Sequence, residues 1–388
     1  MDPFRIQIAE SQLEDLRRRL QTTRLPGSIF RADSKDGTSL SLVKRLVSRW
    51  ADGFDWRTHE ARLNNLPHYL TEIDGTHIHY VHLRGKGPSP APLILTHGWP
   101  GCFVEFERIL PLLTDPAAHG GDAADAFDVI IPSLPGYGFS ASPVTEGVSS
   151  RQIADLWHAL MQKLGYDRFY AQGGDIGAGV SIWLGVLYPE SLLGVHLNYV
   201  SATFRPPLGP DLPPVTAEES AFLERMREFF AEDGAYAAIQ GTRPQTLAFA
   251  LSDSPVGLVA WIAEKFASWT DHDGNFDDAV PLDCLLTIVS IYWFGNTLDS
   301  SLRLYKENRL QPVSLGDFPR SEVPFAISCF PKELPMPPRS WVSRALNVQR
   351  WTEMQRGGHF AALEQPALLA EDIRAAFRPL RNGVGGMA

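Results

Sequence analysis

The chain has 388 residues, 44% of them hydrophobic and 21% charged, which is typical of a globular protein with a large apolar core. Its formal net charge is −10 and it has no dense run of Lys or Arg, so nucleic acid is not expected as a partner. The three cysteines are too scattered for a disulfide framework or a zinc site, and a cytoplasmic location is expected.

The first 70 residues are expected to form a helical extension that packs on the main domain. Leu13, Leu16 and Leu20 recur at helical spacing beside charged neighbours. The first 20 residues lack the apolar stretch of a signal peptide. The longest apolar stretch, residues 285–294, is well short of the roughly 18 to 20 residues that cross a bilayer, so no membrane anchor is expected.

Residues 71–204 have the pattern of an α/β domain. Short apolar runs end in Gly- or Pro-containing loops, as buried parallel strands do, and helical patterns separate them. This alternation predicts a mostly parallel sheet flanked by helices. The expected strands are 73–80, 93–96, 129–131, 168–172 and 194–200, and the expected helices are 105–113 and 149–164.

A Pro-rich connector at residues 205–214 precedes a long, mostly helical stretch. Residues 205–320 are therefore expected to form a helical cap inserted into the sheet domain. Strand patterns return at 323–329 and 349–353, and a helix at 365–377 follows, so residues 321–388 are expected to complete the domain. The tail from residue 382 is expected to be frayed.

The sequence GGDIG at residues 173–177 has the form of a nucleophile elbow, a strained strand-to-helix turn flanked by small residues. The usual central residue is Ser, and here it is Asp175. A Ser that attacked an alkyl carbon would leave an ether, whereas a carboxylate leaves an ester that water can hydrolyse. Asp175 therefore predicts a covalent aspartyl ester. From these five residues alone, a simple helix cap remains the alternative.

Other segments offer partners for such a nucleophile. Backbone N–H groups of Trp99 and Ile176 are candidates for an oxyanion site. His359 follows the last expected strand and is the candidate general base, in the chain order of α/β-hydrolases. Glu333, just past an earlier strand, is the candidate that orients the imidazole, and Asp317 is a weaker candidate because it precedes that strand.

With these motifs the chain resembles the microsomal-type epoxide hydrolases, in their soluble branch, over nearly its whole length. The resemblance implies an α/β-hydrolase fold with a helical cap and N-terminal extension, and conversion of an epoxide and water to a vicinal diol without metal or organic cofactor. The segments that carry it are the helical leader, HGWPG (97–101), GGDIG (173–177), LSDSPVGL (251–258), YKEN (305–308), FPKE (330–333) and RGGHF (356–360).

The resemblance also implies that two cap tyrosines donate to the epoxide oxygen as the ring opens. They correspond to Tyr236 and Tyr305. A phenol in an apolar pocket can supply the proton that an alkoxide leaving group needs. Many relatives have Trp where this chain has Ile176 beside the nucleophile, so their pocket shape and substrate preference are not carried over to this chain.

Two other functions remain open from the sequence. A haloalkane or haloacid dehalogenase would use the same nucleophile and base, and a non-catalytic ligand-binding protein could share the fold. The expected partners are a small epoxide and water, and a homodimer is left open. Relatives of the soluble branch serve in detoxification and in bacterial natural-product pathways, including enediyne assembly, and membership of such a pathway is an expectation of the resemblance.

Overall fold

The computed structural model describes residues 2–27 and 36–381, so the tail 382–388, expected to be frayed, lies outside the described residues. Within these residues the molecule is built on a nine-stranded sheet in the order β1-β2-β3-β5-β4-β6-β7-β8-β9. The pairs from β1 to β5 are antiparallel, and β5, β4, β6, β7, β8 and β9 run parallel. The mostly parallel sheet predicted from the sequence is confirmed. The strands are β1 Asp2–Phe4, β2 His68–Ile73, β3 Thr76–Leu83, β4 Ala91–Thr96, β5 Phe127–Pro132, β6 Phe169–Gly173, β7 Leu192–Leu197, β8 Ser321–Cys329 and β9 Leu346–Glu353.

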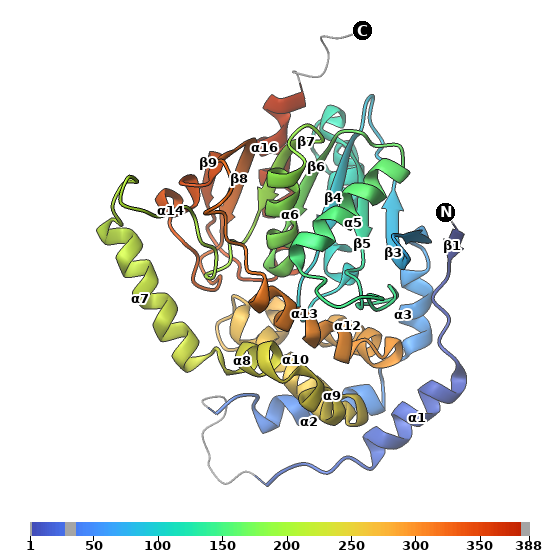
Figure 1. Ribbon diagram of the computed structural model, residues 1–388. Helices are drawn as coiled ribbons and strands as arrows, with labels where there is room; N and C mark the ends of the chain where they lie inside the picture. Colours follow the sequence, from blue (N-terminus) through green and yellow to red (C-terminus); the bar gives the residue numbers. More distant parts are fainter. Residues whose placement is uncertain (1, 28–35, 382–388) are drawn as a thin grey trace.

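The central strands are buried because helices cover both faces of the sheet. The run Leu93, Ile94 and Leu95 in β4 is fully buried, as expected for a strand packed on two sides. In Figure 1, α5 and α6 lie in front of the sheet and α16 lies behind it. The helices of this domain are α4 Leu110–Thr114, α5 Ser150–Lys163, α6 Asp175–Leu187, α14 Arg339–Ser343, α15 Ala361–Glu364 and α16 Pro366–Arg381, with 3-10 segments η1 Phe103–Phe106, η2 Pro116–His119 and η3 Ala123–Asp125.

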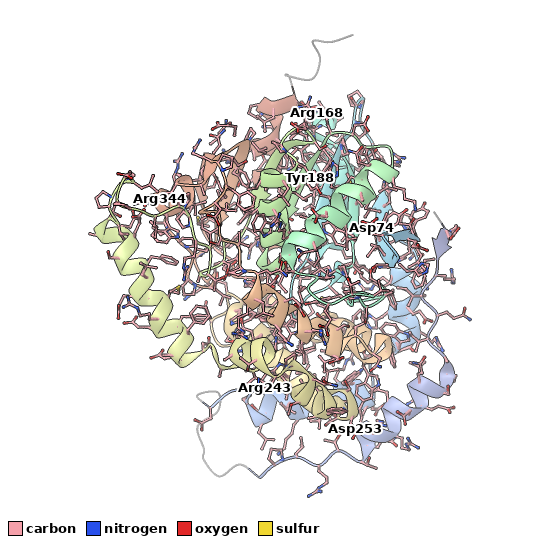
Figure 2. All side chains as sticks on the ribbon, viewed as in Figure 1. Asp74, Arg168, Tyr188, Arg243, Asp253 and Arg344 are labelled. Carbon is pink, nitrogen blue, oxygen red and sulfur yellow. The ribbon has the colours of Figure 1, made fainter. Side chains whose placement is uncertain are left out.

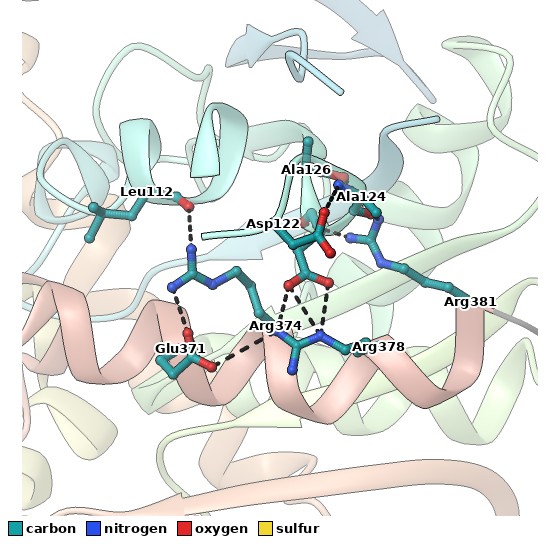
Figure 3. A network of polar contacts seen from close by, with 9 residues as sticks. Leu112, Asp122, Ala124, Ala126, Glu371, Arg374, Arg378 and Arg381 are labelled. Carbon is teal, nitrogen blue, oxygen red and sulfur yellow. Dashed lines mark hydrogen bonds and ion pairs between the residues drawn. The ribbon is translucent and has the colours of Figure 1, made fainter. Parts of the chain in front are cut away.

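Three arginines fasten α16 to the segments around α4 and η3 (Figure 3). Arg374 donates to the carbonyl of Leu112, and Arg381 donates to the carbonyls of residues 124–126. Arg378 pairs with Asp125, whose side chain is almost fully buried. The last helix is thereby held against the back of the sheet.

Residues 217–310 contain the cap helices, which lie below the sheet in Figure 1. The helix α7 reaches outward, and its start is held where Arg344, labelled in Figure 2, pairs with the buried Glu219 at 2.8 Å. Trp99, directly after β4, contacts aromatic rings of α8 and α13, so the cap covers the carboxyl end of this strand. The cap helices are α7 Ala217–Glu232, α8 Ala235–Thr242, α9 Pro244–Asp253, α10 Pro255–Trp269, α11 Phe276–Ala279, α12 Leu282–Gly295 and α13 Leu298–Leu310.

The N-terminal segment is mostly helical, as expected, but it also adds a strand to the sheet, and its first two helices pack on the cap. It begins with β1, which pairs with β2, and continues with α1 Glu10–Gln21, α2 Leu40–Ala51 and α3 Trp56–Leu63. The helices α1 and α2 pack against cap helices α10 and α12. Arg19 pairs with Asp253, which is labelled in Figure 2, and Arg49 pairs with Asp283, so ion pairs join the segment to the cap.

Two local expectations also differ from the structure. The helix expected at 105–113 is divided into η1 and α4, because Pro111 starts a new helix in its first turn. The sequence predicts a solvated strand for the closely spaced His77, His79 and His82, but His79 is fully buried and bonds His68 and Ser133. Over residues 2–27 and 36–381, no single helix is long and apolar enough to cross a membrane, and one bent pair, α9 with α10, meets the criterion by length and composition only.

Candidate active site

Asp175 occupies a sharp turn between β6 and α6. Its φ of 48° lies in the left-handed region, which non-glycine residues adopt only when the surrounding structure imposes it. The neighbouring backbone comes very close: a Cβ added at Gly177 would lie 2.0 Å from the carbonyl oxygen of Thr96. A Cβ added at Gly98 would lie 2.1 Å from Oδ1 of Asp175. The glycines therefore let strand, loop and helix converge on this carboxylate.

The Asp175 carboxylate lies between an amide and an imidazole. The backbone N–H of Trp99 donates to Oδ1 at 2.8 Å, and Nε2 of His359 lies 3.5 Å from Oδ2. Trp99 follows β4, the neighbour of β6 in the sheet. Ile176 is the second residue of α6, so its N–H is one of those that no carbonyl of the helix accepts. Both amides expected at an oxyanion site belong to segments that meet at Asp175.

His359 and Glu333 form a buried pair. Nδ1 of His359 lies 2.6 Å from Oε1 of Glu333, and the two side chains are 2% and 3% exposed. Glu333 follows β8 and His359 follows β9, which is the next strand in the sheet. The weaker candidate, Asp317, is exposed and precedes β8. The structure thus places the imidazole of His359 between the carboxyl groups of Asp175 and Glu333.

Glu333 and Asp175 control the protonation of His359. Burial by itself would lower the pKa of the imidazole, but the negative charge of Glu333 and the hydrogen bonds to Asp175 and Glu333 outweigh burial. The pKa of His359 is therefore raised well above its ordinary value. This raised pKa favours the protonated form of the imidazole.

Tyr236 and Tyr305 come from different cap helices, α8 and α13, and meet over Trp99. Their ring centroids are 5.9 Å apart, and each ring contacts the indole of Trp99, at 5.7 Å and 5.6 Å. Burial raises the pKa of both phenols well above the ordinary value, and the charge of Asp175 acts in the same direction. Both hydroxyls therefore remain protonated and can donate.

The site contains further residues that the sequence analysis did not assign to it. The Trp269 ring lies edge-on to both His359 and Tyr236, at 5.0 Å and 5.3 Å, and its carbonyl accepts the backbone N–H of His359. Tyr199 lies edge-on to His359 at 5.5 Å. The sequence predicts that most aromatic residues of the cap, Trp269 among them, pack between cap helices, and no local pattern distinguishes Trp269 from the others.

A small cavity opens beside Asp175. Its lining includes Gly98, Gly101, Glu105, Asp175 and His359, whereas neither Tyr236 nor Tyr305 lines it. The space available to the centre of a water molecule is ≈ 20 Å³. One water needs about 10–15 Å³ on this measure, so the cavity accommodates a single water next to the carboxylate.

Known proteins match this chain over almost all of its length. The family described as "Epoxide hydrolase N terminus" matches residues 1–106, and "alpha/beta hydrolase fold" matches residues 91–235. A Stigmatella aurantiaca protein named "Putative epoxide hydrolase" is 45% identical over 98% of this chain and 85% of its own length. Epoxide hydrolase 1 of Sus scrofa is 37% identical over 96% of this chain and 87% of its own length.

The similarity extends to solved structures. The Aspergillus niger epoxide hydrolase is 34% identical and superimposes with a TM-score of 0.84, covering 98% of this chain and 96% of that one. The two matching families, the relatives well above 30% identity and the shared fold agree with one another. The chain therefore belongs to the microsomal-type epoxide hydrolases, enzymes of the α/β-hydrolase fold that open epoxides to diols with an aspartate nucleophile.

Proposed function

We propose that Asp175 is the nucleophile of this epoxide hydrolase, that Tyr236 and Tyr305 are its acids, and that His359, oriented by Glu333, is its base. The observation that carries the assignment is the position of the Asp175 carboxylate. Trp99 N–H lies 2.8 Å from Oδ1 and His359 Nε2 lies 3.5 Å from Oδ2, on a backbone turned to φ 48°.

In the first step Oδ2 of Asp175 attacks an epoxide carbon. Oδ1 is the oxygen held by the Trp99 amide, so it becomes the carbonyl oxygen of the ester. The carbon–oxygen bond of the ring breaks, and the released oxygen takes a proton from the tyrosine pair. Phenols with a raised pKa are protonated at the start of this step and are regenerated later.

Ester formation prepares His359 to act as a base. The ionised Asp175 helps to keep the proton on His359, and its charge disappears when the ester forms. The pKa of the imidazole then falls, and the proton becomes available to the tyrosinate left by ring opening. Neutral His359 can take a proton from water as the water oxygen bonds to the ester carbonyl carbon. The Trp99 and Ile176 amides hold the oxyanion until the diol leaves.

The alternative dehalogenase chemistry releases a halide and needs no proton donor for the leaving group, whereas epoxide opening needs one, and two phenols lie above the nucleophile to supply it. Ile176 supplies an aliphatic side chain beside Asp175 and no indole N–H. The trio of Asp175, His359 and Glu333 also argues against a non-catalytic binding protein. Epoxide opening is the chemistry that these residues support best.

The assignment is tested by trapping the ester. A His359→Ala variant incubated with an aryl epoxide should accumulate an adduct on the peptide that contains Asp175, because ring opening proceeds while hydrolysis loses its base. Mass spectrometry of the digested protein measures the adduct, and Asp175→Asn is the matched control that should carry none. An adduct elsewhere, or none at all in either protein, would contradict the assignment.

We also propose a cytoplasmic location and a role in a natural-product pathway, and we leave open whether the protein is a monomer or a homodimer. These proposals rest on the composition of the chain and on the resemblance to the soluble branch. Preference for a rigid polycyclic epoxide over styrene oxide, measured as kcat/KM, would support a natural-product role. Equal or lower turnover of the polycyclic epoxide would favour detoxification, and light scattering would decide between monomer and dimer.

A further inference from the structure

Glu105 is a second carboxyl group at the site, and the roles proposed above do not use it. It belongs to η1, the short 3-10 segment after the HGWPG loop, and it lines the same small cavity as Asp175 and His359. No residue of the predicted site lies on this segment, and its sequence carries no catalytic motif.

The carboxyl of Glu105 is placed at the cavity by the loop before it. A Cβ added at Gly101 would lie 2.4 Å from Oε2 of Glu105. Any side chain at position 101 would therefore need the space that this carboxyl occupies. The last glycine of HGWPG leaves room for Glu105 to reach toward the nucleophile.

The surroundings of Glu105 favour the uncharged form of its carboxyl group. Burial raises the pKa of its carboxyl to about 8, and Asp175 acts in the same direction, while His359 and the Gly98 amide oppose the shift. A neutral carboxylic acid adds no second negative charge beside the nucleophile. It still offers a carbonyl oxygen that can accept a hydrogen bond from water.

We propose that Glu105 is a water-positioning residue that holds the hydrolytic water of the second step. The cavity accommodates one water between Glu105, His359 and Asp175, and it excludes both tyrosines, which serve the epoxide. One hydrogen of the water is donated to the Glu105 carbonyl oxygen and the other to Nε2 of His359. The water lone pair is then directed at the carbonyl carbon of the Asp175 ester.

The step balances with these groups alone. The water oxygen bonds to the ester carbon, and its proton passes to His359 Nε2. The bond between this carbon and the diol oxygen breaks, and the diol oxygen takes the proton from His359. The second proton of the water leaves the restored Asp175 carboxyl and goes to Nε2 of His359, which gave its original proton to the tyrosinate after ring opening. Glu105 neither gains nor loses a proton. This inference rests on the ester mechanism proposed above.

The experiment separates ester formation from ester hydrolysis in single turnovers of the full-length enzyme with an aryl epoxide. In Glu105→Leu, ester formation should stay near the wild-type rate, while hydrolysis should slow by about 10- to 100-fold and the ester on Asp175 should accumulate. Glu105→Gln keeps a carbonyl oxygen without a charge, so hydrolysis should recover to within about fivefold of wild type.

Glu107, at the C-cap of the same 3-10 segment, offers a matched control. Burial also raises the pKa of its carboxyl, but it pairs with Arg62 and does not line the cavity. Glu107→Gln should therefore leave both rates unchanged. If Glu105→Leu does not fold, Glu105→Met replaces it, and a normal rate of ester formation shows that the site is intact.

Two results would overturn the inference: hydrolysis at the wild-type rate in Glu105→Leu, or Glu105→Gln as slow as Glu105→Leu. Failure of the underlying mechanism looks different, because no variant would then form an ester on Asp175. The digest used for trapping distinguishes these cases in the same samples.

Discussion

At the scale of single residues, the groups proposed for ring opening and those proposed for ester hydrolysis lie on two sides of Asp175. The phenols of Tyr236 and Tyr305 lie over Trp99 on the cap side, and Glu105 lies at the small cavity with His359. Each oxygen of the carboxylate has its own neighbour, the Trp99 amide for Oδ1 and His359 for Oδ2. This arrangement allows one carboxyl group to be first a nucleophile and then an acyl carbon.

Loss of the phenol hydroxyls should slow ring opening and leave the rate of ester hydrolysis unchanged. Tyr236→Phe and Tyr305→Phe should each slow ester formation by about 100-fold, and the double variant should abolish it, because the alkoxide loses its donors. Rapid quench followed by mass spectrometry measures the rate. Tyr80→Phe is the control, since the Tyr80 hydroxyl is buried without a hydrogen-bond partner among residues 2–27 and 36–381. Ester formation at the wild-type rate in the double variant would exclude the proposed role.

At the scale of elements, local signals predicted some segments well. Residues 149–164 were expected to be a helix, and α5 spans Ser150–Lys163, because Ser149 and Gln152 form a capping box before an amphipathic stretch. The strand β1 has three residues and was not predicted. Its main-chain pairing with β2 leaves no periodic pattern in the sequence.

The loop after β4 acts as a rigid support for Asp175. Gly98→Ala would place a Cβ 2.1 Å from Oδ1, so the carboxylate must move away from the Trp99 amide. We expect kcat/KM to fall by about 100-fold, with a much smaller effect on Tm. Steady-state kinetics and thermal unfolding check this. Gly209→Ala is the control, because nothing lies within 4 Å of its added Cβ, and an active Gly98→Ala enzyme would show that the loop adapts.

At the scale of the whole molecule, one buried carboxylate joins the last helix to three strands. Asp372 of α16 accepts hydrogen bonds from Ser328 of β8 at 2.6 Å and from Thr352 of β9 at 2.9 Å. His196 of β7 lies 3.1 Å away, and Arg350 of β9 also donates to it. Burial would raise the pKa of Asp372, but the hydrogen bonds, with His196 the largest, lower it below the ordinary value.

Because the pKa of Asp372 is lower in the folded state, the free energy of unfolding depends on pH in the acidic range. The contribution of Asp372 is complete above the ordinary pKa of aspartate, about 4, and is lost as pH falls toward the folded value. Asp372→Asn should reduce the free energy of unfolding by about 3 kcal/mol at pH 7 and weaken its decline below pH 4. Urea unfolding at both pH values measures this. The exposed Asp317→Asn serves as control, and an unchanged acid dependence in Asp372→Asn would contradict the account.

The amino-acid sequence by itself determined the class of fold and the chemical types at the site. Strand and helix periodicities, the glycines around Asp175 and the order of Asp175, Glu333 and His359 are local or sequential features. The tertiary structure decided what meets at the site: Glu105 beside the nucleophile, Trp269 against His359, and the N-terminal helices against the cap. These contacts join residues far apart in the chain, and they depend on how whole elements pack, which no local pattern encodes.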